Sequence, residues 1–190
     1  WIAEFAKYQD TPQYAKINAG MTLSEFKFIY FWEYIHRLWA RMVGFVFLIP
    51  FIYFLMKRWL DRRLMIDLVG AFALGGVVGL FGWIMVASGL IHRPWVNAYK
   101  LSLHLGLGVL LWTYLIWVAA RYSLRNPARQ RISVRMNIQH HKWLIALVFV
   151  QILLGGLMSG MKASLFFPTW PDYHGAWIPA VLWDANNWTW

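Results

Sequence analysis

Residues 143–161 read WLIALVFVQILLGGLMSGM and contain no charged side chain. This length is close to the roughly 20 apolar residues that an α-helix needs to cross about 30 Å of hydrocarbon. Three more apolar runs come earlier: one ends at Met56, one extends from about residue 64 to 91, and one from residue 101 to 120. The sequence therefore predicts an all-α integral membrane protein, a bundle with four transmembrane spans in this chain.

The composition of the whole chain also indicates a membrane protein. Of its 190 residues, 60% are hydrophobic and only 14% are charged, which is too few to cover a water-facing surface. A cytosolic enzyme, a disordered segment and a fibrous protein are therefore poor interpretations. Because the chain has no cysteine, a disulfide framework, a Cys-ligated metal and a thiol nucleophile are excluded, and metal chemistry has to use histidine or oxygen ligands.

The net charge of +10, from 18 Lys and Arg against 8 Asp and Glu, does not indicate a nucleic-acid partner, because the basic residues lie between the apolar runs. Four lie between spans one and two, and six between spans three and four. They are Lys57, Arg58, Arg62, Arg63, Arg121, Arg125, Arg129, Arg131, Arg135 and Lys142. By the positive-inside rule both loops face the cytoplasm or the mitochondrial matrix. We expect a bacterial plasma membrane or a mitochondrial inner membrane.

This orientation predicts five regions along the chain. They are an outer-face segment (1–30), three spans (31–120), a basic inner loop (121–142), a fourth span (143–161) and an aromatic outer loop (162–190). Ser24 is expected to cap a helix that runs from Glu25 into span one.

Small residues at close-packing intervals are expected to bring helix backbones together. They are Gly75 with Gly79, Gly106 with Gly108, and Gly156 with Gly160. Such glycines allow close packing of helices within one chain and between copies of it, so the sequence leaves open whether the protein forms a homo-oligomer.

Span one carries four ionisable side chains in an apolar helix: Glu33, His36, Arg37 and Arg41. Charged groups in a span cost on the order of 2.5–3.5 kcal/mol each on insertion scales and normally face a bundle interior or a functional path. Counting about 20 residues back from Lys57 places the outer hydrocarbon edge near His36 and Arg37. One interpretation is that Glu33 and Arg37, at i and i+4, form an ion pair that merely anchors the helix.

A second membrane histidine, His104, lies in span three, about one turn inside the same boundary. His36 and His104 are thus expected at similar depth on two helices that both run from outside to inside. A lone membrane histidine is more often an interhelical hydrogen-bonding group than a ligand, and for each histidine that alternative stays open. Two imidazoles that face each other across a bundle can ligate one haem iron axially without cysteine. The pair therefore predicts a haem site.

The neighbours of His36 suggest chemistry at that site. Glu33 lies three residues earlier, on nearly the same helical face, where its carboxylate could take a proton or orient water. Arg37 and Arg41 could pair with haem propionates, and Arg41 could equally extend to another polar partner. The other histidines are expected to face solvent, and they are His92, His140, His141 and His174.

Several stretches occur together in a recognisable order. Residues 33–37 read EYIHR, and around them lie 21–28 (MTLSEFKF), 82–86 (GWIMV), 88–90 (SGL), Tyr99-Lys100-Leu101 before His104-Leu105, and Phe167-Pro168 before Trp177-Ile178-Pro179. With these motifs the chain resembles the haem A synthase family over nearly its whole length. The resemblance implies an integral enzyme made of two pseudo-symmetric four-helix bundles, eight spans in all, each bundle with a histidine pair near the outer face.

The resemblance also implies an activity. One bundle holds a haem b cofactor, and the other oxidises the ring methyl of haem O to a formyl group, with water as the oxygen source, to yield haem A for cytochrome oxidase. Glu33, His36 and His104 match the substrate-side bundle, which makes residues 31–120 its three spans and 143–161 the first span of the second bundle. The haem b pair would then lie outside this chain, which begins at Trp1 and is expected to be part of a longer protein.

The resemblance also implies partners, and two rival functions stay open beside it. Haem O is the expected substrate, haem O synthase a candidate supplier, and the electron acceptor is not identified. The first alternative is a bis-histidine b-type cytochrome that only transfers electrons and has no use for Glu33. The second is a non-catalytic assembly protein that binds oxidase subunits through its aromatic tail.

Overall fold

A computed structural model describes residues 1–89, 94–123, 138–166, 168–169, 172 and 174–177. His92, the basic residues from 125 to 135 and most of the expected aromatic loop lie outside the described residues. What is described is built from helices, four long ones and three short ones.

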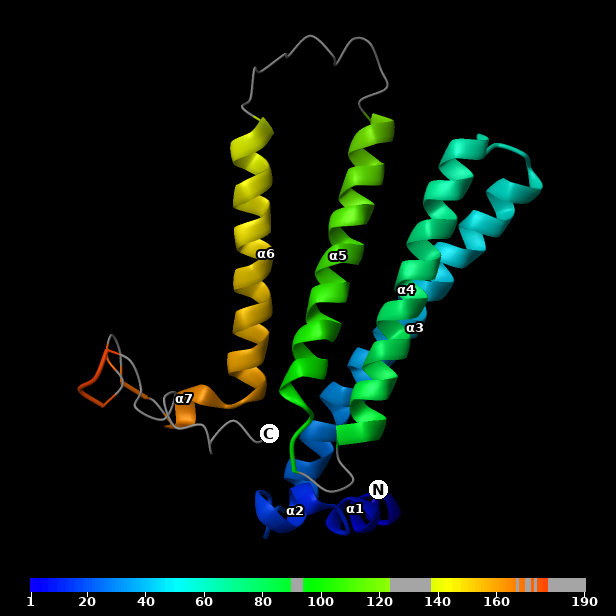
Figure 1. Ribbon diagram of the computed structural model, residues 1–190. Helices are drawn as coiled ribbons and strands as arrows, with labels where there is room; N and C mark the ends of the chain where they lie inside the picture. Colours follow the sequence, from blue (N-terminus) through cyan, green and yellow to red (C-terminus); the bar gives the residue numbers. More distant parts are fainter. Residues whose placement is uncertain (90–93, 124–137, 167, 170–171, 173, 178–190) are drawn as a thin grey trace.

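The four long helices are α3 (Leu23–Met56), α4 (Arg62–Gly89), α5 (Ala98–Ser123) and α6 (Ile138–Gly160). Each contains a stretch long and apolar enough to cross a membrane, and together they confirm the four predicted spans. Figure 1 shows them side by side and alternating in direction, so that α3 and α5 begin at the same end of the molecule.

Helix α3 begins earlier than the first apolar run suggested because a capping box fixes its start. The Thr22 hydroxyl accepts a hydrogen bond from the Glu25 backbone N–H at 3.4 Å, and Glu25 Oε2 accepts one from the Thr22 N–H at 2.8 Å. The prediction that Ser24 caps this helix is therefore wrong, since Ser24 lies inside the first turn. A capping residue must precede that turn with extended backbone, as Thr22 does.

Three short helices lie at the end where α3 and α5 begin: α1 (Ile2–Gln9), α2 (Pro12–Lys16) and α7 (Ala163–Phe166) (Figure 1). The rings of Phe5, Tyr8 and Tyr30 surround Phe26, with centroids 5.1 to 5.6 Å from its ring. Phe26 is only 5% exposed. This aromatic cluster attaches the N-terminal helices to the start of α3.

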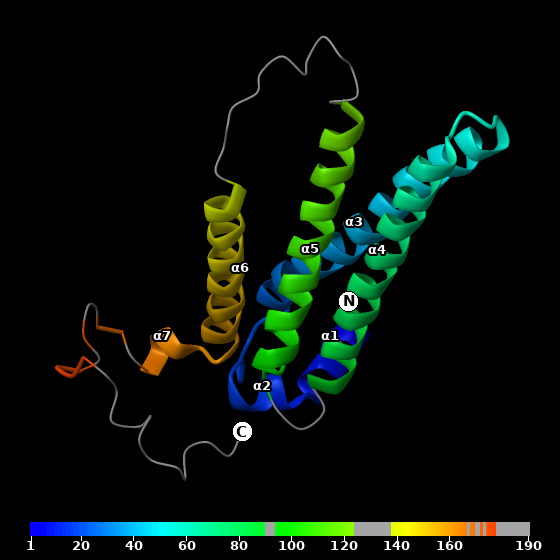
Figure 2. The ribbon, with the colours of Figure 1, turned by 45° about the horizontal axis from the view of Figure 1, so that its top comes forward.

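The long helices do not pack equally. Helix α5 lies between α4 and α6 and contacts both extensively, whereas α3 contacts α4 and, within the described residues, neither α5 nor α6 (Figures 1 and 2). The close packing of α6 on α5 shows no break between the expected regions 31–120 and 143–161. Their division between two bundles stays a prediction.

The contact between α5 and α6 depends on small residues. A Cβ atom placed on Gly160 would lie 2.7 Å from the Ala98 Cα, and one on Gly156 would lie 3.1 Å from the Ser102 Cα. At the same contact the Ser102 hydroxyl donates a hydrogen bond to the Leu153 carbonyl at 2.7 Å. The predicted close packing is confirmed for Gly156 and Gly160. Of the other glycines, Gly106 also meets α6 and Gly75 meets Leu111, whereas Gly79 and Gly108 have no such neighbour within 4 Å in the described part.

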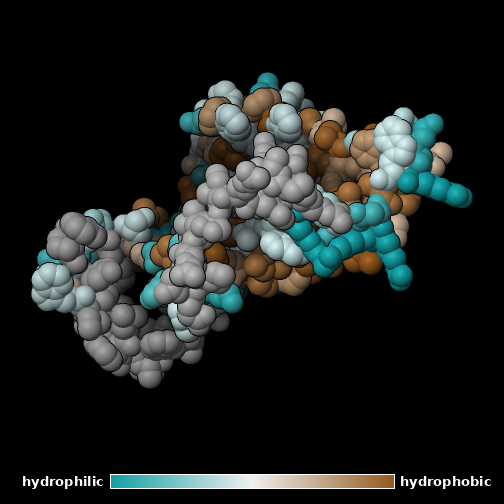
Figure 3. Space-filling view, turned by 90° about the horizontal axis from the view of Figure 1, so that it is seen from above, coloured by the Kyte–Doolittle hydropathy of each residue, from teal (hydrophilic) through white to brown (hydrophobic). Residues whose placement is uncertain are grey.

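Most apolar side chains face outward. In the membrane-spanning windows at most 11% of residues are buried within the described chain. Seen from the end that carries the turn between α3 and α4, hydrophobic residues cover much of the described surface, and hydrophilic residues gather near that turn (Figure 3). Such a surface suits lipid or further apolar helices.

Candidate functional site

His104 lies on α5 and faces α4 rather than lipid. A Cβ atom placed on Gly82 of α4 would lie 2.8 Å from His104 Cε1 and 3.4 Å from each ring nitrogen. The imidazole thus rests directly against the backbone of α4 at a position without a side chain. Its side chain is half-buried.

Neither ring nitrogen of His104 has a hydrogen-bond partner among the described residues. Nδ1 is buried and accepts or donates no hydrogen bond, and none is formed by Nε2 either within the described chain. Nothing among the described residues supports the alternative that His104 is a satisfied interhelical hydrogen-bonding group. Leaving a buried polar atom unpaired costs about 1–3 kcal/mol, so such atoms call for an explanation, of which a functional role is one.

Glu33, His36, Arg37 and Arg41 are all exposed side chains of α3. Arg37 Nη2 donates a hydrogen bond to Glu33 Oε1 one turn earlier, and the two side chains are 52% and 49% exposed. The ion pair that the spacing left open is therefore present. Because both side chains remain half exposed, the pair leaves them accessible to a ligand beside α3.

The two histidines are on helices that begin at the same end of the molecule, where α1 and α2 lie (Figure 1). Each is in the first half of its helix. Within the described residues the backbones of α3 and α5 do not approach each other closely. A bis-histidine haem requires a separation of this kind, because iron and porphyrin lie between the two imidazoles. The pairing of His36 with His104 stays a prediction.

The residues present fit a haem in their chemistry. Both imidazoles lack a competing hydrogen bond in the described structure, and Arg37 and Arg41 supply exposed cations on the helix of His36. Among the described residues no group of three or more His, Cys, Asp or Glu could hold a bare metal ion. A two-ligand haem is therefore the better match to this donor set. As predicted, His140, His141 and His174 are exposed.

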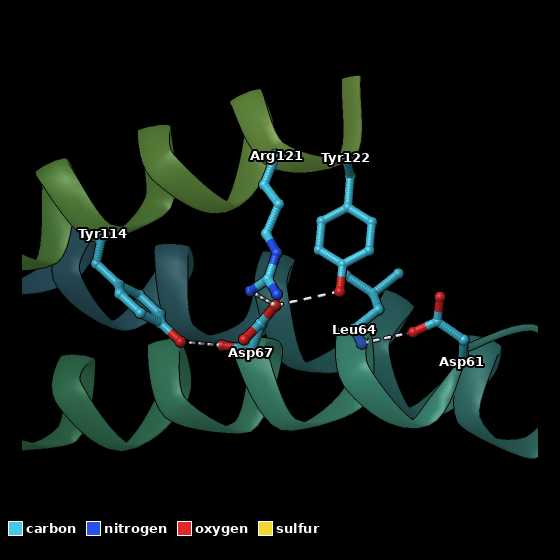
Figure 4. A network of polar contacts seen from close by, with 6 residues as sticks. All are labelled: Asp61, Leu64, Asp67, Tyr114, Arg121 and Tyr122. Atoms are coloured by element: carbon cyan, nitrogen blue, oxygen red, sulfur yellow. Dashed lines mark hydrogen bonds and ion pairs between the residues drawn. The ribbon is translucent and has the colours of Figure 1, made fainter. Parts of the chain in front are cut away.

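A second polar site, which the sequence analysis did not predict, joins α4 to α5 (Figure 4). It lies at the other end of the α4–α5 contact from His104 and Gly82. Asp67 of α4 is 9% exposed. Its Oδ2 accepts hydrogen bonds from Arg121 Nη1 at 3.2 Å and from the Tyr122 hydroxyl at 3.1 Å, while the Tyr114 hydroxyl donates to its backbone carbonyl at 3.1 Å. The network therefore ties α4 to α5 near the basic loops.

The signal for this network was available in the sequence. Asp67 lies about one turn inside span two, and Arg121 and Tyr122 lie at the matching end of the antiparallel span three. Matched depth in the membrane, which pairs His36 with His104, also pairs Asp67 with Arg121 and Tyr122. Gly82 is the other residue that was missed as a site component, and no spacing rule points to it.

A family model described as "Cytochrome oxidase assembly protein", COX15-CtaA, matches residues 1–190. Proteins named heme A synthase are similar to it: one from Nitrosospira multiformis is 44% identical over 99% of this chain and 53% of its own length. One from Rhodospirillum centenum is 43% identical over 98% and 50%, and one from Methylorubrum extorquens 46% over 97% and 48%. The chain thus spans about half the length of these curated relatives. No solved structure matches it.

Proposed function

Since the chain belongs to the COX15-CtaA family of cytochrome oxidase assembly proteins, we propose that it forms the substrate-binding part of a haem A synthase, which oxidises the ring methyl of haem O to a formyl group. Its relatives carry that name, which supports the synthase over the electron-transfer cytochrome. The observation that carries the assignment to this chain is His104, a membrane imidazole with a buried, unpaired nitrogen against α4.

Each site residue has a proposed role. His104 and His36 bind the iron of the haem substrate from two helices whose backbones do not approach each other closely. Arg37 and Arg41 on the helix of His36 meet the propionates through charge-assisted hydrogen bonds.

Glu33 is the proposed acid–base group. It orients the water that supplies the oxygen atom and accepts a proton as the methyl carbon is oxidised. Its hydrogen bond from Arg37 holds the carboxylate one turn from His36, so the group is positioned before the substrate arrives.

The wider assembly is also part of the proposal. Two four-helix bundles with eight spans would accommodate the half of the relatives' length that this chain does not span. A haem b in the second bundle would supply a route for the released electrons to an acceptor, and haem O synthase would supply the substrate. The basic turn after α3 lies at the opposite end from α1 and α2 (Figure 1). This supports a histidine pair toward the outer face of a bacterial plasma or mitochondrial inner membrane.

The experiment that tests the function is chromatographic identification of haems extracted from membranes that express the full-length gene with a supply of haem O. We expect haem A from the wild type and its loss, by at least about tenfold, in His104→Ala and Glu33→Ala. His140→Ala is the matched control, because His140 is an exposed histidine at the other end of the helices.

Three results would contradict the proposal. Haem A at the wild-type level from His104→Ala would remove this histidine from the site. A haem b signal alone, unaffected by Glu33→Ala, would establish the electron-transfer cytochrome instead. An absence of any haem in the wild type would favour the assembly protein.

A further inference from the structure

Gly82 belongs to the GWIMV stretch on α4, and it is where α4 meets the candidate ligand His104. The contact is local to this glycine. Gly79 and Gly76, about one and two turns earlier on the same helix, would accept a Cβ atom with nothing within 4 Å in the described structure. At Gly82 a Cβ atom would meet the His104 ring at 2.8 Å, closer than side chains tolerate, so the ring would have to move.

The position of Gly82 is set by the antiparallel contact of α4 with α5. Along this contact Gly70 faces Tyr114, Gly75 faces Leu111 and Gly82 faces His104. At its far end Asp67 is bonded to Arg121 and Tyr122. These contacts fix the register of the two helices, and with it the place where the imidazole meets α4.

A ligating histidine is normally oriented by a hydrogen bond from its second ring nitrogen to a carboxylate, carbonyl or water. His104 has no such bond in the described structure, although its Nδ1 is buried. Its orientation must therefore come from packing, and the surface it packs against is the bare backbone at Gly82.

We propose that Gly82 is a positioning residue that orients the His104 imidazole for iron binding through steric contact. The inference rests on the proposed function, in which His104 binds the iron of a haem. At other ligating histidines a hydrogen-bond acceptor orients the ring. Here packing against the bare backbone at Gly82 would orient it instead. Adding one methyl group at this position would tilt the imidazole away from the axis on which it meets the iron.

The test uses purified full-length protein and compares Gly82→Ala with Gly79→Ala and Gly76→Ala. The readouts are haem content, the absorption and electron paramagnetic resonance signatures of low-spin and high-spin iron, and the thermal unfolding midpoint. We expect Gly82→Ala to shift the iron at this site from low spin to high spin and to lower haem retention by about 10-fold or more. The two control variants should keep the wild-type spectrum.

A second measurement keeps the test decisive if Gly82→Ala folds poorly. His104→Gly removes the ring that the added methyl group would meet, so His104→Gly and the double variant His104→Gly, Gly82→Ala should fold alike. Added imidazole can then occupy the vacated place. We expect it to restore the low-spin spectrum at a concentration several-fold lower in His104→Gly than in the double variant, because only the glycine backbone leaves room for the ring.

The outcomes separate the two hypotheses. If His104→Ala changes neither haem content nor spectrum, the proposed function fails. If His104→Ala loses the low-spin signal while Gly82→Ala keeps it, His104 remains a ligand and the positioning role of Gly82 is overturned. The same conclusion follows if His104→Gly and the double variant need the same imidazole concentration.

Discussion

Two ion pairs in the described parts of the long helices differ in where their partners lie. Asp67 and Arg121 join α4 to α5, and their side chains are 12% and 25% exposed. Glu33 and Arg37 are both on α3, one turn apart, and are about half exposed. A charge whose partner is on another helix, shielded from its surroundings, holds two helices together. A charge paired within its own helix contributes little to the bundle and stays accessible to a ligand.

The physical reason is the environment of each pair. Removing one member of a shielded pair leaves an uncompensated charge and commonly costs about 3–5 kcal/mol. An exposed i,i+4 pair stabilises a helix by only about 0.2–0.5 kcal/mol. The comparison therefore predicts that substitutions in the two pairs separate stability from activity.

The largest loss of stability is expected for Asp67→Ala. It leaves Arg121 without its carboxylate partner and the Tyr122 hydroxyl without its acceptor, so the free energy of unfolding should fall by about 3 kcal/mol. Denaturant unfolding of the full-length protein in detergent measures this. The control is Asp10→Ala, an exposed aspartate outside the long helices. A loss below about 0.5 kcal/mol, as for a surface pair, would mean that this network does not hold α4 to α5.

A smaller loss is expected where helices are joined without charge. In Gly160→Ala the new methyl group would meet the Ala98 backbone of α5, which cannot turn aside as a flexible side chain can, so stability should fall by about 2 kcal/mol. Gly155→Ala is the matched control, because nothing described lies within 4 Å of that position. Equal unfolding midpoints for the two variants would show that α5 and α6 are further apart in the full-length protein.

Tyr122→Phe separates the hydrogen bond to Asp67 from the charge of Arg121, because it removes the hydroxyl and leaves both charges in place. Its hydroxyl donates to Asp67 Oδ2 at 3.1 Å, and a hydrogen bond to a charged group contributes about 1.5 kcal/mol. The same unfolding experiment should place this variant between wild type and Asp67→Ala. Tyr99→Phe, at an exposed tyrosine of α5, should match the wild type. If Tyr122→Phe equals Asp67→Ala, the hydroxyl and not the arginine stabilises the carboxylate.

The four spans could be predicted from sequence because crossing a membrane constrains length and hydropathy along the chain alone. The prediction that Ser24 caps α3 is wrong, although Thr22 and Glu25 show the capping-box spacing in the sequence itself. What the sequence could not provide was the rotation of each helix about its axis. That rotation decides that His104 faces Gly82, and it depends on how side chains of α4 and α5 fit together.

The candidate site shows the same limit. Glu33 and Arg37 could be paired from sequence because both are on one helix, where spacing fixes the distance. The Asp67 network joins residues more than 50 positions apart, so only a matched-depth argument could have suggested it. The pairing of His36 with His104 rests on that argument and stays a prediction.

The smallest effect on stability is expected for Glu33→Gln, together with a large effect on activity. The substitution removes the charge that Arg37 meets but keeps the shape of the side chain, so unfolding should change by at most about 0.5 kcal/mol. The yield of haem A per folded protein should fall by about 100-fold, because an amide cannot accept the proton. Asp67→Ala should show the reverse order of effects, with the larger loss of stability and the smaller loss of yield per folded protein. If Glu33→Gln instead destabilises as much as Asp67→Ala, the Glu33–Arg37 pair is shielded in the full-length protein and stabilises the fold as the Asp67–Arg121 pair does.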